Sequence, residues 1–114
     1  MRFRRERMAR IFLEALNKIF QRELEVPGAL ITITAVELSR DLARATARIA
    51  ILPKEKEAAA MKSLAVARKH FQHLLTQALD WRLIPEILFE LDQGAENAAR
   101  VEKALLEAAD QRTD

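Results

Sequence analysis

Apolar residues recur every three or four positions near the start of the chain, with charged and amide residues between them. This spacing is typical of an amphipathic helix and predicts a long first helix that ends near Glu25. The helix is expected to stop there because Pro27 disfavours helical backbone at Val26, and Gly28 allows a sharp reversal. The apolar positions are Met8, Ile11, Phe12, Ala15, Leu16, Ile19, Phe20 and Leu24.

The pattern then changes to the two-residue alternation of β-strands. Leu30–Leu38 is rich in β-branched residues, but its alternation changes phase partway along. The apolar residues are Ile31 and Ile33 in the first half, and Val36 and Leu38 in the second. A β-bulge near Ala35 would turn both pairs to the same face of a sheet.

A second strand is predicted from Leu42 to Leu52. Ser39, Arg40 and Asp41 precede it and are suited to a turn. The even positions of this strand include Arg44, Thr46 and Arg48, and its apolar odd positions are Ala43, Ala45, Ala47, Ile49 and Ile51. The two strands should therefore form an antiparallel hairpin with the arginine-bearing face outward.

A second long helix is predicted from Glu55 to Asp80, with an apolar stripe that includes Phe71. A third strand follows from Leu83 to Leu91, and Pro85 near its start indicates an edge strand or an entry position. Its inward residues are Ile87, Phe89 and Leu91, and its outward residues are Glu86 and Glu90. A short helix from Asn97 to Ala109 and a polar tail from about residue 110 complete the chain.

These elements predict a single α+β domain over residues 1–114. The order is helix, strand, strand, helix, strand, helix. Because a helix separates the second and third strands, these are expected to be parallel through a right-handed crossover. The predicted architecture is a three-stranded mixed sheet covered by helices on one face.

Composition narrows the classes of function. The 114 residues include no cysteine, which excludes disulfides, thiolate catalysis and cysteine-bound metals. No apolar run approaches the ~20 residues of a membrane span, and no secretory signal is present, so we expect a cytoplasmic protein without a membrane partner. There is no glycine-rich phosphate loop or nucleophile elbow, so we expect no enzyme and no small-molecule substrate. His70 and His73 have the spacing of a metal pair but lack a third nearby ligand, so neither a metal nor a cofactor is expected.

Positive charge is concentrated at the start of the chain. The first ten residues contain five arginines and one glutamate, a local net charge of +4. Such a cluster favours a polyanionic partner, although a solvated helix surface can look the same. Arg44 and Arg48 could likewise contact phosphates, or they could pair with Glu86 and Glu90 on the neighbouring strand. Trp81 is either a stacking platform beside Arg82 or, as we favour, an anchor in the core.

Four segments together resemble a known family. The order of elements is similar to that of type II KH domains, and the sequence resembles bacterial ribosome-binding factor A over most of its length. The segments are Arg4-x-x-Arg7-Met8 with Ile19-Phe20-Gln21-Arg22-Glu23-Leu24 and Pro27; Thr32-Ile33-Thr34-Ala35-Val36-Glu37-Leu38-Ser39-Arg40-Asp41-Leu42; Arg82-Leu83-Ile84-Pro85-Glu86-Ile87 with Phe89; and Asp92 with Arg100-Val101 and Leu105-Leu106.

The resemblance implies a monomeric, non-enzymatic maturation factor. Such a factor binds the small ribosomal subunit and its rRNA late in assembly, assists rRNA processing and supports growth in the cold. The family has a kinked second helix, but Lys69 stands where the family has a glycine at the kink. The candidate RNA-binding residues are Arg2, Arg4, Arg5, Arg7, Arg10, Arg40, Arg44, Arg48, Arg68, Lys69, His70 and Arg82. The alternative is a protein-interaction module that uses the hairpin edge or the first helix.

Overall fold

The structure is a computed structural model that describes residues 3–92 and Leu106. The predicted helix from Asn97 to Ala109 and the polar tail lie outside the described residues, apart from Leu106. The helices and strands are α1 (Arg4–Glu23), β1 (Leu30–Leu38), β2 (Arg44–Leu52), a 3-10 turn (Lys54–Lys56), α2 (Glu57–Ala78) and β3 (Glu86–Leu91).

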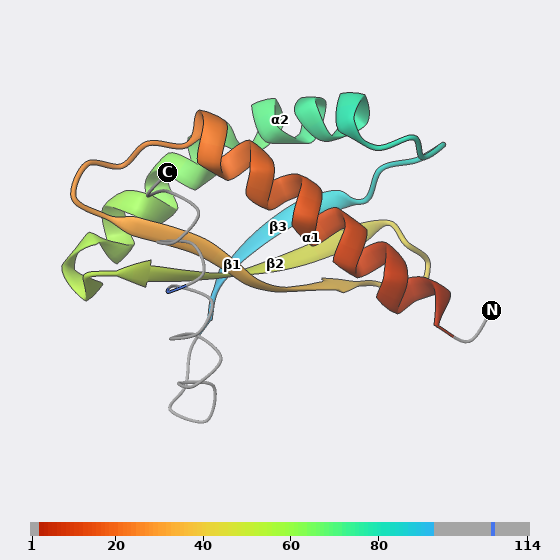
Figure 1. The fold of residues 1–114 in the computed structure, drawn as a ribbon, viewed down its shortest axis with the longest axis horizontal. Coiled ribbons are helices and arrows are strands. Elements are labelled where there is room, and N and C mark those ends of the chain that lie inside the picture. The colour runs from red at the N-terminus through yellow and green to blue at the C-terminus, as the bar shows by residue number, and fades with distance from the viewer. Residues whose placement is uncertain (1–2, 93–105, 107–114) are drawn as a thin grey trace.

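The three strands form one mixed sheet in the order β1-β2-β3. β1 and β2 are antiparallel, and β2 and β3 are parallel with α2 between them in the sequence. Figure 1 shows α1 crossing the sheet with α2 beside it. The buried side chains of both helices join those of the sheet in a single hydrophobic cluster. The predicted fold class is therefore confirmed.

Aromatic side chains connect the layers of the core. Phe20 of α1 lies 5.4 Å from Phe71 of α2 and 5.8 Å from Phe89 of β3, measured between ring centroids. Phe12 lies 6.2 Å from Trp81, which is half-buried against the core. Such tilted pairs add to the stabilisation that burial provides. Trp81 is thus an anchor for the chain after α2, as the sequence favoured.

The first helix buries a narrower stripe than the sequence predicted. Its buried residues are Phe12, Leu16, Ile19 and Phe20. The prediction is wrong for Ile11, which is 46% exposed. Ile11 lies one residue before Phe12, so it is about 100° around the helix from the centre of the stripe.

The predicted bulge in β1 is confirmed. The pairing with β2 shifts register between Ile33 and Ala35, which leaves Thr34 as the extra residue. The Thr34 hydroxyl lies 3.3 Å from the Arg48 carbonyl and 2.5 Å from Asp92 Oδ2. The bulge residue therefore ties β1 to the end of β3 across the central strand, and both halves of β1 direct their apolar side chains into the core.

Two strands begin later than predicted, each for a local reason. β2 starts at Arg44 because Leu42 has a φ of 61°, a left-handed conformation that no strand residue adopts. β3 starts at Glu86 because the preceding Pro85 has no N–H to donate, and Leu83 is 82% exposed. β3 is an edge strand, in agreement with the position of the proline.

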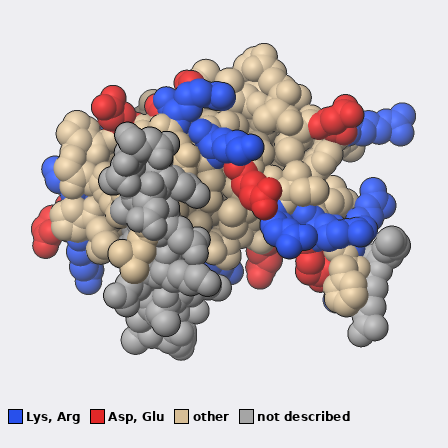
Figure 2. Space-filling model, viewed as in Figure 1, with Lys and Arg blue, Asp and Glu red and all other residues tan. Residues whose placement is uncertain are grey.

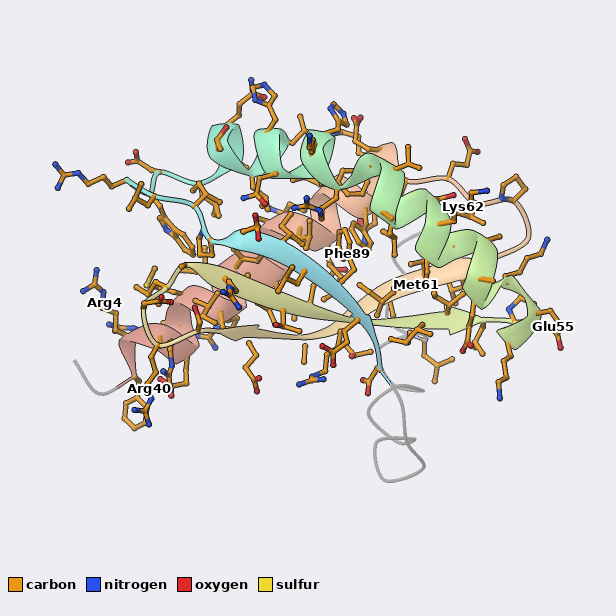
Figure 3. The ribbon with its side chains drawn as sticks, turned by 180° about the vertical axis from the view of Figure 1, so that it is seen from behind. Arg4, Arg40, Glu55, Met61, Lys62 and Phe89 are labelled. Carbon is orange, nitrogen blue, oxygen red and sulfur yellow. The ribbon has the colours of Figure 1, made fainter. Side chains whose placement is uncertain are left out.

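The second helix is shorter than predicted and bends. Lys54–Lys56 forms a 3-10 turn, and α-helical geometry extends from Glu57 to Ala78. Figure 3 shows the axis of α2 changing direction partway along its length. Helical structure continues through Lys69, so the bend forms without the family's glycine.

Gln72 of α2 fixes the start of β3. Its amide nitrogen donates to the Pro85 carbonyl, and its amide oxygen accepts from the Ile87 N–H, both at 2.8 Å. The side chain thus bonds to two backbone groups at the outer edge of β3, as a further strand would. This pair of bonds attaches the edge strand to the helix.

We expect Gln72→Ala to lower the free energy of unfolding by about 1–3 kcal/mol, because it leaves two partly buried backbone groups without their partners. Urea denaturation would measure the loss. Gln77→Ala is the matched control, since Gln77 is exposed on the same helix and its side chain forms a hydrogen bond only with His73 within the described residues, at 3.4 Å. Equal effects of the two substitutions would contradict the role of Gln72.

Candidate nucleic-acid interface

Three segments that are distant in the sequence meet at one end of the molecule. Figure 1 shows the start of α1, the turn between β1 and β2 and the connection from α2 to β3 at this end. We call it the basic end. Its cationic residues are Arg4, Arg5, Arg7 and Arg10 on the first turns of α1, Arg40 in the hairpin turn and Arg82 in the connection. Arg2 lies outside the described residues.

Most of these arginines have no acidic partner in the part of the chain that the structure describes. Arg4, Arg5, Arg10 and Arg40 are exposed, and none forms an ion pair with any residue that the structure describes. Figure 2 shows lysine and arginine side chains along the exposed face of α1, most densely where the helix begins. Figure 3 places Arg4 and Arg40, from two different elements, at the same end. These guanidinium groups are available to an anionic partner.

The hairpin turn that carries Arg40 is held by side-chain hydrogen bonds. The Ser39 hydroxyl donates to Asp41 Oδ1 at 2.7 Å and accepts from the Arg44 N–H at 3.0 Å. Asp41 Oδ1 also accepts from the Ala43 N–H at 3.1 Å. The Leu42 N–H donates to the Ser39 carbonyl at 2.9 Å. The turn therefore has a defined backbone conformation around Arg40.

These bonds act on the ionisation of Asp41. The Ser39 hydroxyl, followed by the Ala43 N–H and the charge of Arg44, lowers the pKa of the Asp41 carboxyl below its usual value of 3.8. Hydrogen bonds and a nearby cation favour the charged form of a carboxyl group. Asp41 is therefore a carboxylate at neutral pH, and it holds the turn in that form.

The lowered pKa makes the contribution of Asp41 to stability depend on pH. A carboxyl group whose pKa is lower in the folded state stabilises the fold above its unfolded pKa, and the contribution is lost as the pH falls through the folded pKa. We expect wild type to be more stable than Asp41→Asn near neutral pH and the difference to shrink as the pH falls below 3.8, the usual pKa of the carboxyl group. Urea midpoints across this range would measure it. A difference independent of pH would contradict the charged turn.

The two arginines on the outer face of β2 have different surroundings. Arg48 lies 2.9 Å from Glu90 of β3 and 3.7 Å from Glu37 of β1. Arg44 is paired in register with Glu86 but forms no ion pair among the described residues. Cross-strand pairing therefore holds for Arg48, whose charge is balanced, and not for Arg44, which remains exposed beside the hairpin turn. The sequence carried a signal for Glu37 as well. After the change of phase in β1, Val36 and Leu38 face the core, so Glu37 between them lies on the outer face of the sheet, where Arg48 is.

The candidates on α2 do not form one group. Arg68 and Lys69 line a shallow groove with Gln72, Ile84 and Glu86. His70 points to another neighbour, with its Nε2 3.2 Å from the carboxylate of Glu23 at the end of α1. Three candidates that are consecutive in sequence are thus divided between two surfaces.

The described part of the chain contains no cluster of three histidine, cysteine or acidic side chains that could hold a metal ion. His73 lies 3.4 Å from Gln77, measured between the side-chain nitrogens. In the same part of the chain, no helix combines the length and the apolar character that crossing a membrane requires.

A groove beside the basic end was missed by sequence reasoning. It lies between the first turns of α1 and the end of β1, and Arg5 and Arg40 both line it. No local signal could have found it, because its two walls are about thirty residues apart in the sequence and meet only in the folded sheet.

Comparison with known proteins gives one consistent result. The family model for ribosome-binding factor A matches residues 4–105. A ribosome-binding factor A from Caldicellulosiruptor bescii is 33% identical over 111 residues, which cover 92% of this chain and 84% of that protein.

Solved structures agree in fold. A Thermotoga maritima protein described as a putative ribosome binding factor A has a TM-score of 0.67 and 26% identity, and the match covers 82% of this chain and 92% of that one. A Thermus thermophilus ribosome binding factor A, fitted as a homology model into a cryo-EM map of its complex with the 30S subunit, has a TM-score of 0.63 and 24% identity. That match covers 72% of this chain and 88% of the other.

Proposed function

This chain belongs to the ribosome-binding factor A family, and we propose that it binds the small ribosomal subunit through rRNA at the basic end. The observation that carries the proposal is the group of exposed arginines from separate elements that have no acidic partner in the described structure. The name of the relatives and the 30S complex of the Thermus protein support the choice of partner.

The binding mechanism rests on phosphate neutralisation. Arginine guanidinium groups can grip phosphate oxygens with two parallel hydrogen bonds, and each contact releases counterions from the RNA. The proposed contacts are Arg44, which is exposed beside the hairpin turn, and the six arginines of the basic end, Arg4, Arg5, Arg7, Arg10, Arg40 and Arg82. Arg68 and Lys69 form a second, weaker cationic surface on α2, while Arg48 and His70 have carboxylate neighbours.

The wider role follows from the family. We propose a non-catalytic, monomeric assembly factor that acts in the cytoplasm on the late small subunit and assists rRNA processing. Residues 1–114 form a single domain in this proposal, and no cofactor or small-molecule substrate takes part.

Co-sedimentation with isolated small and large ribosomal subunits over a range of salt concentrations would test this function. If about four to six of the seven proposed arginines contact phosphates, log affinity for the small subunit should fall with log salt at a slope of roughly −3 to −5. Equal binding to both subunits, or binding that is insensitive to salt, would contradict the proposal.

The alternative, a protein-interaction module, receives less support. Such a module would bind its partner through the apolar face of α1 or through the free edge of the hairpin. The apolar stripe of α1, however, is buried in the core. At the β1 edge, Asn17 of α1 accepts a 3.4 Å hydrogen bond from the Ile33 N–H.

A further inference from the structure

The groove between α1 and the β1–β2 hairpin is open to solvent, and its lining combines charged and apolar residues. Its volume is about 470 Å³, within the range of small-ligand sites. Its lining includes two arginines, two glutamates and the partly buried apolar residues Ala9 and Val36. A purely anionic ligand would not suit such a lining, because the carboxylates would repel it.

The two arginines come from opposite walls. Arg5 is on the first helical turn and Arg40 is in the hairpin turn, and neither has an ion-pair partner among the described residues. The hydrogen bonds of Ser39 and Asp41 fix the backbone on either side of Arg40. The backbone around Arg40 therefore needs little ordering before a phosphate binds, and the entropic cost is limited mainly to the two arginine side chains.

The two glutamates differ in their availability. Glu37 lies 3.7 Å from Arg48. Glu6 makes no ion pair within the described structure and lines the groove next to Arg5. A carboxylate accepts hydrogen bonds only, so Glu6 suits a base edge that carries N–H donors. Guanine carries a ring N–H beside its exocyclic amino group, so it can donate two hydrogen bonds to one carboxylate, whereas uracil has a single ring N–H between two carbonyl oxygens.

We propose that this groove holds one unpaired nucleotide of single-stranded RNA. The phosphate lies between Arg5 and Arg40, the base packs against Ala9 and Val36, and its amino edge donates to Glu6. An unpaired base is required because only a base outside a helix can present its Watson–Crick edge to protein. This inference rests on the proposed function, since it specifies what the basic end recognises in the rRNA.

Binding of the full chain to short uridine oligonucleotides with and without one central guanine, followed by fluorescence anisotropy, would test the inference. Wild type should prefer the guanine-containing oligonucleotide by at least about fivefold, the lower range for a good bidentate base contact. Glu6→Gln should reduce that preference to below about twofold. Arg5→Gln and Arg40→Gln should weaken both oligonucleotides equally and reduce the salt slope by about 0.7 per contact.

Lys54→Gln and Lys62→Gln are the matched controls, since both lysines are exposed at the other end of the molecule, where Figure 3 labels Lys62. They should leave the base preference unchanged. Amide NMR shifts should locate the bound oligonucleotide at Ala9, Val36 and Arg40. Equal binding of the two oligonucleotides by wild type, or shifts confined to other elements, would overturn the inference.

Parallel co-sedimentation separates the two claims. If wild type binds the small subunit with the expected salt slope but shows no base preference, the groove inference fails and the proposed function stands. If wild type shows the base preference but does not bind the small subunit, the proposed function fails and the groove remains an RNA site.

Discussion

Replacing Phe71 by alanine is expected to lower the free energy of unfolding by about 3–5 kcal/mol, the usual loss for a buried phenylalanine. Its side chain is only 1% exposed, and its ring lies 5.4 Å from that of Phe20. Because Phe20 also contacts Phe89, the cavity would open where both helices meet the sheet. A domain of this size has a total stability of about 5–15 kcal/mol, so the variant would lose a large share of it.

Urea denaturation of Phe71→Ala beside Val66→Ala provides the comparison. Val66 is on the same helix but is 81% exposed, so its substitution should change the stability by no more than about 0.5 kcal/mol. A loss below about 1 kcal/mol for Phe71→Ala would show that the ring does not fill the core and that the register of α2 is wrong.

Reversing two charges at the basic end, Arg4→Glu with Arg40→Glu, is expected to weaken binding to the small ribosomal subunit by about a hundredfold or more. The loss of two charge-assisted hydrogen bonds to phosphate accounts for a decrease in affinity of this size. The two new carboxylates add repulsion from the phosphates. The fold should not change, because both side chains are exposed and outside the hydrophobic cluster. Co-sedimentation at fixed salt would measure the loss.

The control is a double reversal of equal charge at the other end, Lys54→Glu with Lys62→Glu. It changes the net charge by the same amount, so any effect of overall charge would appear in both variants. We expect it to retain most of the affinity, and circular dichroism should be the same for both. Similar losses in the two variants would show that binding depends on net charge and not on the basic end.

The sequence predicted the fold well because most of its signals are local. Periodicity located both long helices, and the phase change in β1 located the bulge to within a residue. The strand starts were harder, since the left-handed Leu42 carries no glycine signal and propensity alone extends β2 through it. The burial of Ile11 was also predicted wrongly. Periodicity shows which residues form the apolar stripe of a helix, but it does not show how much of the width of that stripe the sheet covers.

The candidate site was predictable in its residue types but not in its grouping. Arginine clusters are visible in the sequence, and so is the possible pairing of Arg48 with Glu90, yet only the fold shows that Arg44 lacks the matching ion pair among the described residues and that His70 lies next to Glu23. Gln72 gave no signal at all, because an amide on a helix looks like any exposed polar residue until the edge of β3 is placed against it. Which of the candidates contact RNA remains a prediction.

The parallel pairing of β2 with β3 has a consequence for the order of folding. The hairpin closes through a short turn, whereas pairing Arg44 with Glu86 closes a loop of about forty residues at a larger entropic cost. We therefore expect the hairpin to form early and β3 to join late, after α2 is in place. The basic end includes Arg40 from the early part and Arg82 from the late part. A nascent chain would thus bring Arg82 to its cationic surface only as β3 joins the sheet.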